Sequence, residues 1–345
     1  MFKTKKVLIL CTDFMYYAET HKRAFEKLGW DALVLPSHLT LRKNQYIRRL
    51  LAFLKITRNR DDFLAKKEKY NNLICSTIDS FHPELLYCCF LPNQLFLKTI
   101  QYAKEKGIVL ALLLPDTIDS EDGGCDNISL FDCVFSYEKT DIVKLKRFGI
   151  DVLPLLGSYD EQQYYPMNCD KTIDVSFVGK MYDNRRIILE KLVYDFPTVK
   201  FRFYGEYAPF RKIIKYLRWF ASPRIKECFV NKNIPFSEVN KVYNSSKIVL
   251  DIHCERSKDG WSSRLPEISA TGVFQIVDSN PSIEEELGTD FVTFKNYEEL
   301  KEKIDYYLNN EAEREIMAEK EWNRIKGMTR YNDAVTVLKV LNHEE

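Results

Sequence analysis

The sequence has no apolar run that is long enough to cross a membrane. Its longest clear run, Ile108–Leu114, has the length of a strand, whereas a membrane-spanning helix needs about 18 apolar residues or more. The N-terminus has no secretory signal pattern either. These absences predict a soluble, cytoplasmic protein, with a peripheral position at the inner face of the membrane as the other option.

Disulfide signals are equally scarce. The nine cysteines are an odd number, and no two of them form a C-x-x-C pair. Cys11, Cys88 and Cys89 lie inside apolar runs, where a thiol acts as a small buried hydrophobe. The cysteines therefore indicate a reducing cytoplasm.

Two further absences argue against classes of ligand. The 51 basic and 50 acidic residues leave a net charge of +1, so no overall field favours nucleic acid. The G-x-G-x-x-G fingerprint is missing after the first apolar strand, which weakens any interpretation as an NAD or FAD enzyme. Composition is otherwise that of a soluble globular protein, and 345 residues suit two domains.

What the sequence does contain is a regular alternation of strand-like and helix-like patterns. Apolar runs without polar alternation are typical of parallel strands that are buried on both faces. Lys5–Cys11 is such a run. Strands alternating with helices recur up to Val152–Leu156, and the alternation restarts at Asp174–Gly179, after a polar and aromatic segment. We therefore predict an N-terminal doubly wound α/β domain over 1–156, a linker over 157–171, a second such domain over 172–320, and a C-terminal helix over 321–345 for which packing on the first domain is one arrangement.

The stretch Lys247–Gly288 has the pattern of a ligand-binding edge. A buried strand at Lys247–Ile252 leads into a polar loop, and a short helix at Arg264–Thr271 follows, with Gly272 as its stop. A second apolar strand and a further helix complete the stretch. In open α/β sheets, the loops at the carboxyl ends of the strands bind the ligand.

Several segments resemble one family of enzymes. In the second half they are DVSFVGKMYDNRR (174–186), IPFSEVNKVYNSSKIVLDIH (234–253), WSSRLPEISATGVFQIVDSNPSIEEEL (261–287) and YEELKEKIDYYLNNEAERE (297–315), and in the first half LFDCVFSYEKTDIVKLKRFGIDVLPLLGSYD (130–160). They resemble the CgeB-like (spore maturation protein) glycosyltransferases, which are related to retaining enzymes of the glycosyl transferases group 1 type. The resemblance implies the GT-B fold, in which two Rossmann-like doubly wound domains face each other across a cleft, with a helical C-terminal tail.

The resemblance also implies an activity. A sugar passes from a nucleotide-sugar, bound by the C-terminal domain, to an acceptor held by the N-terminal one. Related enzymes often carry two acidic residues separated by seven others, the first near the donor sugar and the second on the ribose. Asp259 and Glu267 have this spacing, with Asp in place of the usual first Glu.

A departing diphosphate requires groups that stabilise negative charge. Free N–H groups at the start of the helix after Ser262 and Ser263 suit a phosphate, and the adjacent Arg264 suits bidentate phosphate contact. Similar enzymes place positive donor-binding side chains just after the strand Asp174–Gly179. With fixed cations in these positions, we expect no metal and no cofactor besides the nucleotide-sugar. The predicted donor-binding residues are Gly179, Lys180, Arg185, Arg186, Gly205, Asp259, Gly260, Trp261, Ser262, Ser263, Arg264 and Glu267.

Each of these residues also has a structural explanation. Asp259-Gly260 is a common turn pair, and Glu267 is an ordinary charge for a short helix. Arg264 would equally pair with a carboxylate. The cations after Gly179 would also suit a solvated helix start, so we expect only one or two of them to contact the donor.

Asp251, His253 and Glu255 alternate along a strand and its continuation. A metal site is the less favoured explanation for them, because only one His is present and no spaced partner accompanies it.

The acceptor side is predicted from the first half. Asp13, Tyr16 and Tyr17 follow the first strand, where acceptor-binding loops lie in this fold. Asp116 and Asp119 follow another strand, and either of these two would serve as general base if the reaction inverts the anomeric centre. An ordinary solvated acidic loop is the alternative. The predicted catalytic residues are Asp259, Lys180, Arg264, Asp13 and Asp116.

Two basic-aromatic stretches, 42–60 and 211–226, read as amphipathic helices. They are either solvated helix faces or an interface with an anionic membrane surface that brings the enzyme to a lipid-linked acceptor.

The leading hypothesis is a metal-independent glycosyltransferase of the hexosyltransferase type. It would act on a glycan, lipid-linked or protein acceptor in cell-surface or spore-coat polysaccharide synthesis. The alternatives are a non-catalytic relative that binds a nucleotide or glycan, and a nucleotide-sugar epimerase or hydrolase of the same fold.

Overall fold

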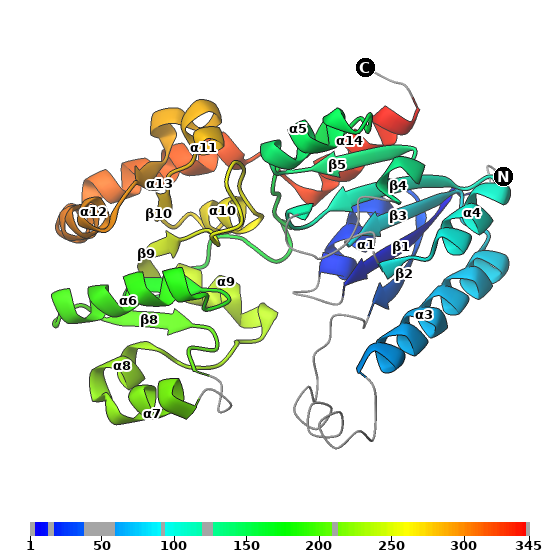
Figure 1. Ribbon diagram of the computed structural model, residues 1–345. Coiled ribbons are helices and arrows are strands. Elements are labelled where there is room, and N and C mark those ends of the chain that lie inside the picture. The colour runs from blue at the N-terminus through cyan, green and yellow to red at the C-terminus, as the bar shows by residue number, and fades with distance from the viewer. Residues whose placement is uncertain are drawn as a thin grey trace. The chain divides into compact units, whose positions relative to one another are not determined.

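The computed structural model describes residues 4–12, 17–37, 59–90, 94–118, 127–208 and 213–342; the side chains of 59–62, 213–215 and 218 lie outside this description. The chain forms two compact units. The first joins Met1–Leu155 to Arg330–Glu345, and the second is Leu156–Thr329. Each unit contains one parallel sheet with helices on both faces (Figure 1). This confirms the prediction of two doubly wound α/β domains.

The sheet of the first unit has the strand order β2-β1-β3-β4-β5-β6. Along β1, Leu8 and Leu10 face one core, whereas Val7 and Ile9 face the other. The strand shows no polar alternation in its sequence because both of its faces are buried. The strands are β1 Lys6–Thr12, β2 Asp31–Ser37, β3 Leu85–Cys89, β4 Val109–Leu114, β5 Cys133–Ser136 and β6 Leu153–Pro154.

The two faces of this sheet are covered by different helices. The core on one face is closed by α3 (Asn59–Phe81), α4 (Leu97–Glu105) and α5 (Lys139–Arg147). The core on the other face is closed by α1 (Tyr17–Lys27) and α14 (Arg330–Leu341), which contact each other. The C-terminal helix is thus part of the first unit. A short 3-10 helix, η3, spans Ile128–Leu130.

The sheet of the second unit has the strand order β11-β10-β9-β7-β8. Its strands are β7 Ile173–Val178, β8 Phe201–Tyr204, β9 Ser246–Asp251, β10 Gln275–Asp278 and β11 Val292–Phe294. Its helices are α6 Asp183–Asp195, α7 Ile213–Ala221, α8 Pro223–Cys228, α9 Phe236–Asn244, α10 Arg264–Ser269, α11 Pro281–Glu286, η4 Gly288–Asp290, α12 Tyr297–Asn309 and α13 Glu311–Ile325.

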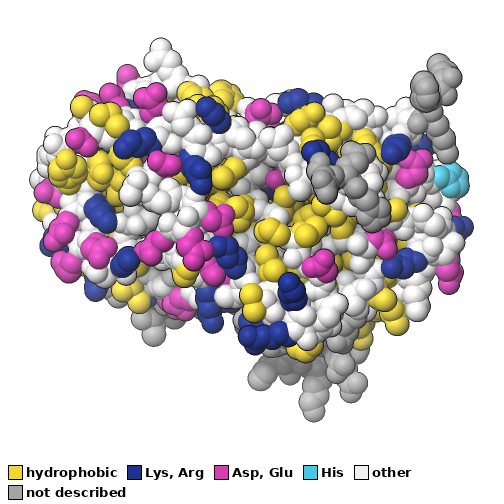
Figure 2. Space-filling model, turned by 90° about the horizontal axis from the view of Figure 1, so that it is seen from above, with side chains coloured by type: hydrophobic (Ala, Val, Ile, Leu, Met, Phe, Trp, Pro, Cys, Tyr) yellow, Lys and Arg dark blue, Asp and Glu magenta, His cyan; other side chains and the backbone are white. Residues whose placement is uncertain are grey.

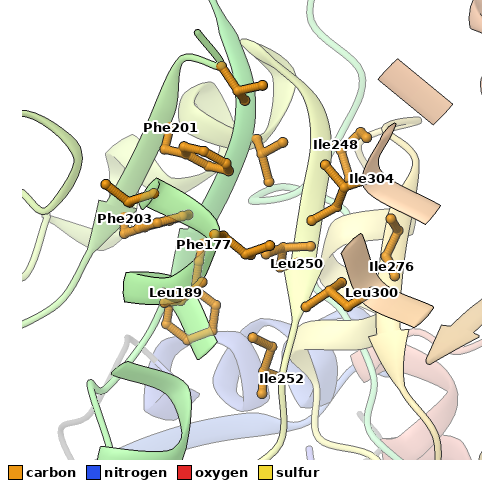
Figure 3. Close-up of a cluster of buried hydrophobic side chains, with 14 of the residues drawn as sticks. Phe177, Leu189, Phe201, Phe203, Ile248, Leu250, Ile252, Ile276, Leu300 and Ile304 are labelled. Atoms are coloured by element: carbon orange, nitrogen blue, oxygen red, sulfur yellow. The ribbon is translucent and has the colours of Figure 1, made fainter. Parts of the chain in front are cut away.

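The core of the second unit holds its three central strands together. Phe177, Leu250 and Ile276, from β7, β9 and β10, lie in one cluster with Leu300 and Ile304 of α12 (Figure 3). Full burial of one such side chain contributes about 1.5–3 kcal/mol. The opposite face of the sheet is covered by α9 and α10, which contact the same strands. The carboxyl ends of β7, β9 and β10 are therefore fixed relative to one another.

The segment predicted as a linker packs within the second unit. The ring of Tyr164 is buried, with the Phe236 ring centroid at 5.7 Å and the Tyr243 ring centroid at 6.3 Å. Asn244 holds the backbone of the same segment, accepting a hydrogen bond from the Met167 N–H at 2.7 Å.

The surface carries both signs of charge. On the face seen in Figure 2, Lys and Arg side chains are interspersed with Asp and Glu side chains, in agreement with the net charge of +1. Within the described part of the chain, no helix is both long and apolar enough to cross a bilayer.

Two glycines bring the ends of β7 and β8 together. Gly205 has a φ of +148°, and a Cβ placed there would lie 2.1 Å from the carbonyl oxygen of Gly179. Real Cβ atoms essentially never approach another heavy atom within 3.0 Å. Any side chain at position 205 would therefore push the two strand ends apart.

We expect Gly205→Ala to lower the free energy of unfolding by about 2 kcal/mol or more, because it adds a clash to a φ that side chains rarely adopt. Gly327→Ala is the matched control, since a Cβ there meets nothing within 4 Å. Its effect should stay within about 0.5 kcal/mol. Equilibrium denaturation in urea measures both, and equal values for the two variants would contradict the close approach.

Candidate functional site

The predicted donor residues gather at the carboxyl ends of the strands of the second unit. Gly179 and Lys180 follow β7, Gly205 follows β8, and the loop from Ile252 to Ser263 follows β9. Parallel strands end at one edge of a sheet, which is where ligands bind in open α/β folds.

Arg264 is fixed at this edge by a buried carboxylate. Its Nη1 donates to Oδ1 of Asp251 at 2.9 Å and to the carbonyl oxygen of Ile252 at 3.2 Å. Asp251, the last residue of β9, is fully buried. Burial alone would lower the pKa of Arg264, but the charge and the hydrogen bond of Asp251, together with the charges of Tyr243 and Glu267, outweigh burial and raise the pKa. The Arg264 guanidinium is therefore a permanent charge.

A second guanidinium converges on the same carbonyl group. Nε of the buried Arg185 donates to the Ile252 oxygen at 2.7 Å, and its Nη1 donates to the Lys180 oxygen at 2.9 Å. Both guanidinium carbons lie 5.5 Å from the centroid of the Phe177 ring. Burial, followed by repulsion from Arg264, lowers the pKa of Arg185 to about 10. Two like charges are thus held together at one strand end.

The other two predicted cations differ from this pair. Lys180 is partly exposed, and its Nζ lies 5.1 Å from the centroid of the Tyr182 ring. Arg186 is bound within its own helix, donating from Nη1 to Glu190 at 2.5 Å and from Nε to Asp183 at 3.4 Å. Arg186 is thus largely buried and paired within α6 rather than solvated, and its role toward a donor stays a prediction.

Asp259 connects its loop to α11. Its Oδ1 accepts hydrogen bonds from the N–H of Ser282 at 2.9 Å and from the Ser282 hydroxyl at 2.7 Å. Nδ2 of Asn280, the N-cap of α11, donates to the Gly260 oxygen at 2.8 Å. These contacts agree with the turn explanation of Asp259-Gly260, and a role of Asp259 toward the donor sugar stays a prediction.

The start of α10 is closely packed. Trp261 is fully buried, and its Nε1 has no hydrogen-bond partner among the described residues. A Cβ at Gly157 would lie 2.4 Å from the backbone of Ser262 and 2.6 Å from that of Ser263, so only glycine fits beside this peptide. Glu267 is buried in the first turn of α10. Its predicted contact with a ribose stays a prediction.

His253 is a polar residue of this edge that we did not predict as part of the site. The ring is buried, and its Nδ1 lies 2.5 Å from Oδ1 of Asp278 at the end of β10. The signal available in the sequence was the alternation of Asp251 with His253, but the partner carboxylate lies 25 residues away. Among the described residues, no group of three or more His, Cys, Asp or Glu side chains could hold a metal ion.

Comparison with known proteins gives a family model and several similar folds. Residues 185–338 match a family model described as "Glycosyl transferase-like". The chain is similar to sucrose-phosphate synthase from Thermosynechococcus elongatus, at 10% identity over 98% of both chains with a TM-score of 0.67. The fold is GT-B.

Two other solved structures are similar to this GT-B chain to the same extent. Anabaena HepE, solved in complex with UDP-glucose, has 11% identity over 98% of this chain and 99% of its own, with a TM-score of 0.67. The trehalose-6-phosphate synthase OtsA has 12% identity over the same shares, also with a TM-score of 0.67. A comparison with curated proteins finds no match. At such identities the likeness establishes the fold alone.

The predicted acceptor residues of the GT-B chain are only partly described. Asp13, Tyr16 and Asp119 lie outside the described residues. Tyr17 begins α1, and the guanidinium carbon of Arg330 lies 5.0 Å from the centroid of its ring. Asp116 follows β4, where its Oδ1 accepts a hydrogen bond from the Thr117 N–H at 2.9 Å. The acceptor and general-base roles stay predictions.

We expect Asp251→Asn to lower the free energy of unfolding by about 3 kcal/mol, because it leaves the buried side of Arg264 without its counter-charge. Asp183→Asn removes a carboxylate that is 63% exposed and pairs with Arg186, so it should cost about 0.5 kcal/mol or less. Urea denaturation at pH 7 compares the two variants. A loss at Asp251 no larger than that at Asp183 would contradict the importance of the buried pair.

Proposed function

We propose that the chain is a CgeB-like glycosyltransferase of the hexosyltransferase type, which transfers a sugar from a nucleotide-sugar without a metal ion. One observation carries this proposal. Two guanidinium groups, of Arg185 and Arg264, are held on one carbonyl group at the ligand-binding edge of the sheet. Both residues belong to the segment that matches the glycosyltransferase-like family model.

The chemistry of the donor explains why such a pair is useful. When the bond between sugar and diphosphate breaks, negative charge develops on the phosphate oxygens. Guanidinium groups that are already fixed stabilise this charge without reorganising during the reaction. Lys180, which is partly exposed beside them, would add a third positive charge. With three cations at the diphosphate, a divalent metal is not required.

The remaining donor contacts follow from the same arrangement. Glu267 would bind the ribose hydroxyls, and Asp259 would lie near the sugar. The acceptor, a glycan, a lipid-linked glycan or a protein, would be held by the first unit, with Asp116 or Asp119 as general base if the anomeric centre inverts. We place this activity in the cytoplasm, in the synthesis of cell-surface or spore-coat polysaccharide.

A non-catalytic relative that binds the nucleotide without turnover is the second candidate. The observation that favours it is the use of Oδ1 of Asp259 to hold Ser282 at the start of α11. The candidates differ in turnover. A glycosyltransferase releases a nucleoside diphosphate only when an acceptor is present, and a non-catalytic relative does not turn over the donor. An epimerase or hydrolase consumes the donor without an acceptor.

We expect one of UDP, GDP, CMP, ADP and dTDP to raise the melting temperature of the chain. At 100 times its dissociation constant, such a ligand adds about 2.7 kcal/mol of stability. Glu267→Gln keeps the shape of the buried side chain but removes its charge, and it should weaken binding about ten-fold or more if the carboxylate holds the ribose.

Glu238→Gln is the control for this variant, since Glu238 is an exposed residue in the first turn of α9 in the same unit. Thermal-shift titrations compare the three chains. If no nucleotide stabilises the wild type, the donor site is wrong; if Glu267→Gln binds as tightly as the wild type, only the ribose role is wrong.

We also propose that α7 contacts an anionic membrane surface near a lipid-linked acceptor. Tyr216 and Trp219 pack on the core, and Trp219 donates from Nε1 to the Phe229 oxygen at 3.0 Å. On the outer face, Leu217 is 55% exposed and Phe220 is 59% exposed. Nζ of Lys226 lies 4.8 Å from the centroid of the Phe220 ring. An exposed apolar face with a cation beside it suits the surface of an anionic bilayer.

Of the other stretch, 42–60, nearly all lies outside the described residues.

Vesicle sedimentation tests this surface. The wild type should bind vesicles with a high content of phosphatidylglycerol and release them as salt rises, because screening weakens the attraction. Phe220→Ser should reduce the bound fraction several-fold. Ile316→Ser, at a residue of α13 that is 52% exposed, is the control and should bind as the wild type does. Equal binding to neutral vesicles would count against the proposal.

A further inference from the structure

The proposed donor site lies at the carboxyl ends of β7, β9 and β10, which we call the donor edge. The end of β9 makes the contacts that fix its cations. Asp251 binds the Arg264 side chain, and the Ile252 carbonyl receives hydrogen bonds from Arg185 and Arg264. The carbonyl oxygen of His253 accepts from Nδ2 of Asn184 in α6 at 3.2 Å. Two consecutive residues, Asp251 and Ile252, thus connect β9 to both guanidinium groups, and the next, His253, connects it to α6.

His253 in turn is held by one carboxylate. Its backbone N–H lies 2.9 Å from both carboxylate oxygens of Asp278, and its Nδ1 lies 2.5 Å from Oδ1. The other ring nitrogen, Nε2, is buried and has no hydrogen-bond partner among the described residues. Oδ2 of Asp251 is also buried and has no hydrogen-bond partner among the described residues. Polar atoms of this kind are rare in folded proteins and call for an explanation.

The protonation of His253 sets the net charge of this cluster. Arg185 and Arg264 contribute two positive charges, and Asp251 and Asp278 contribute two negative ones. The four cancel, so the cluster carries +1 when His253 is an imidazolium and 0 when it is neutral. The thiol of Cys254, the carboxylate of Glu255 and the guanidinium of Arg256 follow on the next turn, and the last two charges cancel each other.

Several groups act on the imidazole. Burial alone would lower the pKa of His253, but the charges of Asp278 from β10 and Asp251 from β9 outweigh both burial and the repulsion from Arg264, and the pKa is raised. An imidazole with a raised pKa stabilises the fold fully below pH 6.5, and this contribution is lost as pH rises through the pKa of the folded state.

We propose that His253 is a positioning residue for the donor diphosphate: paired with Asp278, its imidazole ring holds the turn to which both guanidinium groups bind, and in its protonated form it supplies the positive charge that the four other groups lack in sum. This inference rests on the proposed donor site. It goes beyond the predicted contacts, because His253 acts on the diphosphate through Arg185 and Arg264 and through its charge.

A consequence is that donor binding weakens as His253 loses its proton. Neutral imidazole still donates from Nδ1 to Asp278, so the turn keeps its geometry and only the charge is lost. One unit charge acting across a partly solvated site changes the affinity for a doubly charged diphosphate by about five-fold.

The first test is made on the ligand-free chain. Titration of the histidine ring signals by NMR should give His253 a pKa above 6.5, and Asp278→Asn should bring that value down. A wild-type pKa at or below 6.5, or a pKa that Asp278→Asn leaves unchanged, would overturn the proposed pairing of His253 with Asp278. This result does not depend on whether the chain binds a nucleotide.

The second test measures UDP-glucose binding by calorimetry at pH 6.0 and pH 8.5. UDP-glucose has no terminal phosphate that titrates near pH 6, so a change in affinity reports on the protein. The wild type should bind about five-fold more weakly at the higher pH. His253→Asn keeps a donor near Asp278 without the charge, and it should bind at both pH values as weakly as the wild type does at pH 8.5.

His82→Asn is the matched control, since His82 is an exposed histidine of the first unit at a φ of +53°, which Asn tolerates. It should keep the pH dependence of the wild type. A wild type that binds equally at both pH values would overturn the role of the charge. No binding at either pH would exclude UDP-glucose as the donor and overturn the role of His253 toward that ligand, while the titration still tests the pairing of His253 with Asp278.

Discussion

The buried ion pair between Arg264 and Asp251 is the interaction on which the donor edge depends. A guanidinium taken out of water is costly unless a counter-charge and hydrogen bonds accompany it. Asp251 supplies the counter-charge from the end of β9, and the Ile252 carbonyl supplies a further acceptor. The pair joins the first residue of α10 to the strand before its loop. Because Arg185 uses the same carbonyl, a displacement of this strand end would move both cations together.

Close backbone contacts give this edge its rigidity. Gly205 lies against the Gly179 carbonyl, and Gly157 lies against the peptide between Ser262 and Ser263. At both places the distance leaves no room for a Cβ, so the loops after β7 and before α10 are held by main-chain contact rather than by flexible side chains. Fixed dipoles and charges act on a transition state without a reorganisation cost, which is why a site for phosphate transfer or departure benefits from such packing.

The fold could be predicted from the sequence because burial on both faces leaves a clear pattern. The runs at β1 and β3 lack polar alternation, and helical patterns separate the strand-like segments. The site could be predicted only as a segment. Whether a cation faces a ligand or a carboxylate depends on its neighbours: Arg186 meets Glu190 one helical turn away, whereas Arg185 reaches across to β9. The pairing of His253 with Asp278 depends on the parallel register of β9 with β10, in which Val277 lies beside Asp251, and no local pattern encodes that register.

The contacts of the last helix are likewise not encoded by any local sequence pattern. Arg330, the first residue of α14, lies over the ring of Tyr17 and pairs with Asp333 within α14. Its apolar residues Ala334 and Val337 enter the same core as Val7 and Ile9 of β1. The helix therefore completes the face of the first sheet that α1 leaves open, next to a residue predicted to bind the acceptor. A helix that is remote in sequence thus packs beside the residue that begins α1.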